Sequence, residues 1–180
     1  MSRIAMIERA PASSQATEVD RHAFLGSHRA ISVGAREFTR LSEALVAAAK
    51  QMAPAHGAEP PTSRLSPDRC IVQVGPVALT VLYIRNGTDV PAGGQLLAMV
   101  WRGTIAARGD HVPERMPARR VTPQPVAVWE ETHVVSADNE ASWHWHPKSL
   151  LECGYTSPEL ADRCMEQLRA ALVESAPVVA

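Results

Sequence analysis

Between residues 70 and 146 the sequence holds five runs with the character of strands, the first two rich in β-branched residues, separated by turn residues and by no helical pattern. The dipeptide Gly75-Pro76 separates the first two runs, which predicts a β-hairpin. Parallel strands need long crossover connections, usually helices, so the runs predict an antiparallel, meander-like sheet. The five predicted strands are residues 70–74, 77–85, 95–105, 125–135 and 141–146.

One helical pattern precedes these runs and another follows them. In residues 34–52, apolar side chains recur on one face with a period of about 3.6 residues. The second helix is expected to begin at Ser157, a good N-cap, with Pro158 at N1 and Glu159 in the first turn. Each helix has one apolar stripe, so we expect both to pack on one face of the sheet. The predicted fold class is therefore α+β, a two-layer sandwich of a five-stranded antiparallel sheet and two helices.

The distribution of small polar residues and prolines predicts the domain organisation. Residues 10–17 are small and polar and cannot bury enough surface to offset their ordering entropy. We therefore expect a flexible N-terminal arm over residues 1–32, one α+β domain over 33–175, and a frayed C-terminus over 176–180. Residues 54–67 hold four prolines, which predicts a loop after the first helix.

The composition excludes several classes of protein. A net charge of −1 over 180 residues argues against a nucleic-acid binder that works by bulk electrostatics. No apolar run approaches the roughly 20 residues that cross a bilayer. Three cysteines without a C-x-x-C spacing favour reduced thiols and a cytoplasmic location. The excess of arginine over lysine, with abundant alanine, is typical of a GC-rich bacterial genome.

The last two runs bring several polar residues together in the predicted sheet. If Asp138-Asn139 forms a two-residue turn, His133 faces His144, and residue 131 faces residue 146. Because side chains alternate along a strand, Glu131, His133, His144 and His146 would share one face. The opposite face would then carry Thr132, Val134, Trp143 and Trp145, which have the character of core residues.

Three imidazoles and one carboxylate on one face form a candidate metal site. Directly opposed Cβ atoms lie about 5 Å apart, so the side chains of Glu131, His133, His144 and His146 could converge on one ion. Such a set suits a divalent transition metal such as Zn, Fe, Mn or Ni. The simpler interpretation is the solvated face of an antiparallel sheet, and a third is a ligand or partner surface without metal.

Two further features indicate a binding surface. On the same alternation, Trp129 lies on the face of Glu131 and His133, and an outward tryptophan often anchors an interface. The long connection of residues 108–123 carries Arg115, Arg119 and Arg120, which could hold a phosphate or an acidic partner.

The sequence contains no nucleotide-binding glycine loop and no G-x-S-x-G nucleophile motif. We therefore expect a non-catalytic cytoplasmic accessory or assembly protein, without a cofactor, that binds another protein or itself. The alternatives are a metal-dependent enzyme that uses the His/Glu cluster, and a small-ligand module with a concavity between sheet and helices.

Overall fold

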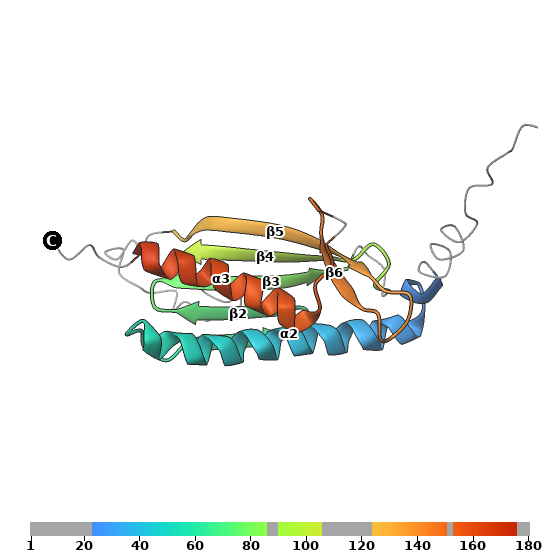
Figure 1. The fold of residues 1–180 in the computed structure, drawn as a ribbon, viewed down its shortest axis with the longest axis horizontal. Coiled ribbons are helices and arrows are strands. Elements are labelled where there is room, and N and C mark those ends of the chain that lie inside the picture. The colour runs from blue at the N-terminus through green and yellow to red at the C-terminus, as the bar shows by residue number, and fades with distance from the viewer. Residues whose placement is uncertain (1–22, 86–89, 106–123, 151–152, 176–180) are drawn as a thin grey trace, which may run out of the picture.

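The computed structural model describes residues 23–85, 90–105, 124–150 and 153–175. Two long helices flank a run of strands in the chain (Figure 1). The elements are α2 (His28–Ala55), β1 (Thr62–Ser66), β2 (Arg69–Val74), β3 (Val77–Ile84), β4 (Gln95–Arg102), β5 (Val126–Ser136), β6 (His144–Pro147) and α3 (Ser157–Ser175).

Helix α2 begins earlier and ends later than its apolar stripe predicts. The side chain of Ser27 accepts a hydrogen bond from the backbone N–H of Ala30, which fixes the first turn. Leu25 and Ala30 are buried, so the packed part of the chain extends before residue 33. Pro54 lies in the last turn of the helix. The predicted boundary between arm and domain at residues 32–33 therefore falls inside α2, whereas residues 1–22 and 176–180 lie outside the described residues.

The strands form one antiparallel sheet in sequence order, β1 to β6. This arrangement confirms the α+β class and the antiparallel meander, with six strands instead of the five predicted. The additional strand is β1, at one edge of the sheet, in the segment that the prolines predict as a loop. Pro61 and Pro67 directly bracket it, and four of its five residues are exposed. An edge strand needs no apolar pattern and tolerates flanking prolines, so its sequence lacks the signal of a buried strand.

Both helices lie on the same face of the sheet, as predicted (Figure 1). Helices α2 and α3 contact each other; α2 packs on β2, and α3 packs on the central strands β3 and β4. The core between the layers is built from fully buried side chains of both helices and of the sheet. It includes Phe38, Leu41 and Leu45 of α2, Leu160 and Leu168 of α3, and Val72, Leu79, Leu96 and Trp145 of the strands.

Helix α3 is capped one residue earlier than the sequence suggests. The carbonyl of Thr156 accepts the first helical hydrogen bond, from Leu160. The carboxylate of Glu159 accepts hydrogen bonds from both the N–H and the hydroxyl of Thr156, so its side chain makes one half of a capping box. This shift frees Ser157, which is 1% exposed, to accept a hydrogen bond from Trp145 Nε1 at 3.1 Å and to donate one to Glu37 Oε2 at 3.0 Å.

Candidate functional site: the helix-free face of the sheet

The pairing of β5 with β6 differs from the predicted hairpin. Ser136 lies opposite His144, and His133 lies opposite Pro147. The prediction that His133 faces His144 is therefore wrong by three positions in register. Because side chains alternate along a strand, an odd shift exchanges the two faces of β6 relative to β5.

The cause lies in the connection between the two strands. Asp138 and Asn139 do not form a two-residue turn, because the loop continues to Ser142. The hydroxyl of Ser142 accepts hydrogen bonds from the N–H groups of both residues, at 2.9 and 3.0 Å. The side-chain oxygen of Asn139 accepts a further bond from the N–H of Ala141. These local hydrogen bonds stabilise a longer loop than the two turn residues alone indicate.

As a result, the four predicted metal ligands do not lie on one face. Glu131 and His133 are on the face that packs against the helices, whereas His144 and His146 are on the opposite face. The rings of His144 and His146 are 6.3 Å apart. Within the described residues, no group of three or more His, Cys, Asp or Glu side chains is placed to hold a metal ion.

On the helix side, Glu131 is bound by α3. Arg163 donates two hydrogen bonds to its carboxylate, each at 2.7 Å. This pairing lowers the pKa of Glu131 and raises that of Arg163. His133 is fully buried, with Nε2 at 3.2 Å from Glu131 Oε2, at a geometry that forms no good hydrogen bond. Burial lowers the pKa of His133, which favours the neutral imidazole. The two hydrogen bonds between Arg163 and Glu131 tie α3 to β5.

Of the predicted partner-binding residues, the structure describes Trp129. Trp129 shares a face with Glu131 and His133, as predicted, but this is the helix side, where Trp129 packs against the core. The expectation that it lies opposite Trp143 and Trp145 is therefore wrong. Arg115, Arg119 and Arg120 lie outside the described residues.

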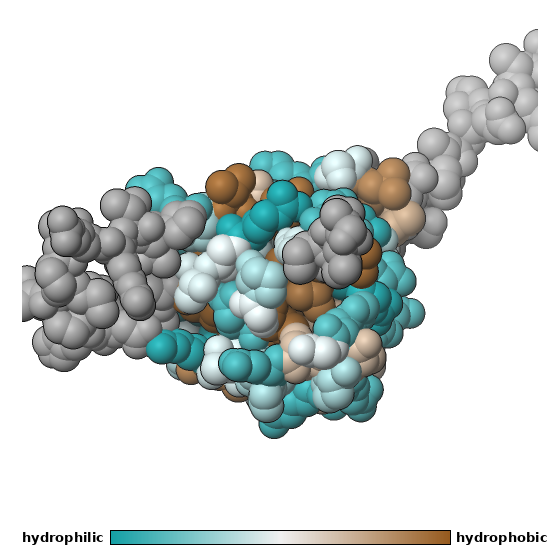
Figure 2. Space-filling model, turned by 90° about the vertical axis from the view of Figure 1, so that its left-hand side faces the viewer, coloured by the Kyte–Doolittle hydropathy of each residue, from teal (hydrophilic) through white to brown (hydrophobic). Residues whose placement is uncertain are grey.

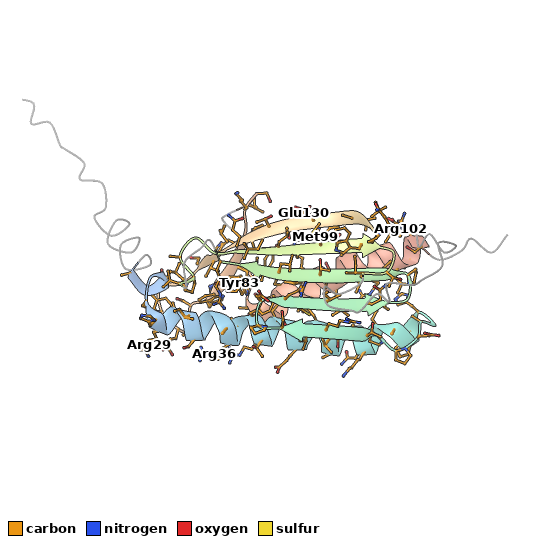
Figure 3. All side chains as sticks on the ribbon, turned by 180° about the vertical axis from the view of Figure 1, so that it is seen from behind. Arg29, Arg36, Tyr83, Met99, Arg102 and Glu130 are labelled. Carbon is orange, nitrogen blue, oxygen red and sulfur yellow. The ribbon has the colours of Figure 1, made fainter. Side chains whose placement is uncertain are left out.

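The surface that remains without a helix, among the described residues, is the opposite face of the sheet (Figure 3). We call it the helix-free face. The register places alternate residues of β1 to β5 on it. They include Arg64, Arg69, Ile71, Gln73, Ala78, Thr80, Leu82, Ile84, Leu97, Met99, Trp101, Glu130 and Thr132. Its central strands β3 and β4 contribute mostly apolar side chains. Ala78 and Thr80 of β3 are buried, Leu97, Met99 and Trp101 of β4 are partly exposed, and Ile84 at the end of β3 is 44% exposed.

Three polar side chains of the helix-free face have hydrogen-bond partners within the chain. The indole N–H of Trp101 donates a hydrogen bond to the hydroxyl of Thr80 at 2.9 Å. The side-chain amide of Gln73 donates to the carbonyls of Gly75, Val77 and Gly103, and its oxygen accepts from Ile105. A partner can therefore cover this region without leaving these donors unpaired, and such unpaired groups are a main cost of burying a polar surface.

One sequence signal could have identified this face. Residues 77–84 and 95–102 are apolar at nearly every position and do not alternate with polar residues. Such runs are typical of strands that are covered on both faces, whereas two helices cover only one face here. The end of the molecule seen in Figure 2 is largely hydrophilic and carries separate apolar patches.

The space between the sheet and the helices is filled by the core. The larger hollows in the described residues lie at the surface. One, of about 600 Å³, is bounded by α2, the start of α3 and the connection between β5 and β6. Another, of about 510 Å³, lies between the C-terminal half of α2 and α3.

No family model matches this chain, and no significant match is found among curated proteins or solved structures. Among the helices that the structure describes, none combines the length and the apolarity needed to cross a lipid bilayer.

Proposed function

We propose that this chain is a non-catalytic, cytoplasmic accessory or assembly protein that binds protein through the helix-free face. The observation that carries the proposal is the apolar centre of this face, on β3 and β4, with its polar groups already hydrogen-bonded. Apolar surface without unpaired polar groups is what the centre of a protein interface requires.

The residue types on this face also support the proposal. Met99 and Trp101 are neighbours on this face of β4 and are both partly exposed, and the exposed Ile84 lies on the same face at the end of β3. Aromatic residues and methionine are enriched in the centres of interfaces, where lysine and glutamate are depleted. We therefore assign to Trp101, which lies on the opposite face, the interface role that the sequence suggests for Trp129.

Site-specific photo-crosslinking tests the proposal directly. A photoreactive amino acid replaces Met99 in one variant and Glu166, an exposed residue of α3, in a matched control. We expect the probe at Met99 to give one defined adduct in cells, with a protein identified by mass spectrometry, and the control probe to give none. Leu97→Lys should remove the adduct, because it places a charge in the apolar centre. Absence of an adduct at Met99, or the same adduct at both positions, would contradict the proposal.

A further inference from the structure

One row of residues crosses the helix-free face from edge to edge. Arg64 of β1 pairs with Ile71 of β2, which pairs with Thr80 of β3, then Met99 of β4, and finally Glu130 of β5. Figure 3 shows Met99 and Glu130 on neighbouring strands of this face. The row therefore has a guanidinium at one end and a carboxylate at the other. Between them lie Ile71 and Thr80, which are 6% and 7% exposed, and the partly exposed Met99. Arg64 and Glu130 are both exposed, and Arg64 also makes a contact within its own chain.

This order makes the row complementary to a second copy of itself. Strands are about 4.8 Å apart, so Arg64 and Glu130 lie about 10 Å from Thr80 in opposite directions. A twofold axis that runs parallel to β3 and passes over Thr80 reverses the order of the strands. It therefore places Arg64 of one copy over Glu130 of the other, in two equivalent pairs. Ile71 then lies over Met99 of the other copy.

We propose that the occupant of the helix-free face is a second copy of this chain, packed sheet against sheet around this axis. This inference rests on the proposed function and names its partner. The assembly has helices outside and two sheets inside, at the roughly 10 Å spacing of face-to-face sheets. A twofold contact uses the same surface twice, so it requires a surface with this self-complementary order of charges.

The neighbouring rows are compatible with the same axis. It places Gln73 over Trp101 of the other copy, and Arg69 over Leu97 of the other copy. The hydrogen bonds of Gln73 are already made within its own chain. The aliphatic part of Arg69 can cover an apolar side chain while its charged group points outward. Along these rows no like charges are placed opposite each other.

Charge reversal tests the arrangement with the full chain. Arg64→Glu and Glu130→Arg are made singly and together, with Glu166→Arg on α3 as a matched control. Sedimentation equilibrium should give twice the 19.5 kDa chain mass for the unchanged protein and the control. Each single variant should raise the dimer dissociation constant at least tenfold, because it places like charges in contact twice per dimer. The double variant should return it to within about threefold of the original value.

Further outcomes separate this inference from the proposed function. A protein that stays monomeric at 100 µM, or a dimer that persists in Met99→Lys, overturns self-association through this face. Failure of the double variant to restore the dimer overturns the twofold arrangement. If the chain is monomeric while the probe at Met99 still identifies another protein, the inference fails and the proposed function stands. Circular dichroism of each variant confirms that a loss of the dimer is not a loss of the fold.

Discussion

Removing one buried hydroxyl should reveal how strongly helix α3 is tied to the rest of the core. In Ser157→Ala the indole N–H of Trp145, which is fully buried, loses the acceptor at 3.1 Å. An unpaired buried donor costs about 1–3 kcal/mol. Glu37 loses a donor at 3.0 Å but keeps its ion pair with Arg40 at 2.8 Å, so its charge stays compensated.

The two losses together should lower the free energy of unfolding by about 2–4 kcal/mol, since a hydrogen bond to a charged group contributes about 1.5–3 kcal/mol. Alanine is the better helix former, which offsets only about 0.5 kcal/mol of this loss. Urea unfolding, followed by tryptophan fluorescence and circular dichroism, measures the change.

The matched control is Ser175→Ala at the other end of α3. Its hydroxyl donates only to the carbonyl of Ala171, so the expected change is within about 0.5 kcal/mol. If Ser157→Ala costs no more than this control, the hydroxyl does not connect Trp145 to Glu37 as described.

Three further predictions concern other parts of the fold. Thr156→Ala should lower the free energy of unfolding by about 1 kcal/mol through loss of the cap, and Thr156→Ser should not, by the same urea measurement. Unfolded histidine takes up a proton below about pH 6.5, whereas burial lowers the pKa of His133. The melting temperature should therefore fall as the pH drops from 7 to 5. His133→Leu should make the melting temperature depend less on pH, and an equal dependence in both proteins would refute this prediction. Gly34→Ala places a Cβ atom 2.9 Å from Cη2 of Trp143, so it should destabilise by about 1–3 kcal/mol despite a better helix propensity. A rise in melting temperature would contradict this prediction.

The parts of the fold that depend on local pattern could be predicted from the sequence. The apolar stripe centred on Leu41 and Leu45 predicts α2, because only one face of that helix is buried. The hairpin of β2 and β3 follows from two apolar runs and from Gly75, whose φ of 53° is a conformation that glycine adopts readily. The antiparallel order of the strands could be predicted because the sequence shows no helical pattern between the apolar runs.

The register of β5 and β6 could not be predicted in the same way. Asp138-Asn139 has the residue types of a tight turn, but the side chain of Ser142 stabilises a longer loop. The longer loop shifts the register by an odd number of residues. This shift places His144 and His146 on the face opposite to Glu131 and His133. That Trp129 shares a face with His133 was predictable from alternation along one strand, whereas the identity of that face depends on the tertiary fold.

The two edges of the sheet limit how copies of this chain can assemble. The outer edge of β6 is occupied, because Trp145 and Tyr155 exchange two backbone hydrogen bonds, at 2.8 and 2.9 Å. The other edge is a five-residue strand enclosed by Pro61 and Pro67. Neither border offers a long template on which strands could be added indefinitely. Growth into a ribbon or fibre by pairing of edge strands is therefore disfavoured. A dimer that packs the two helix-free faces together would be a closed assembly, because both copies of that face would be used.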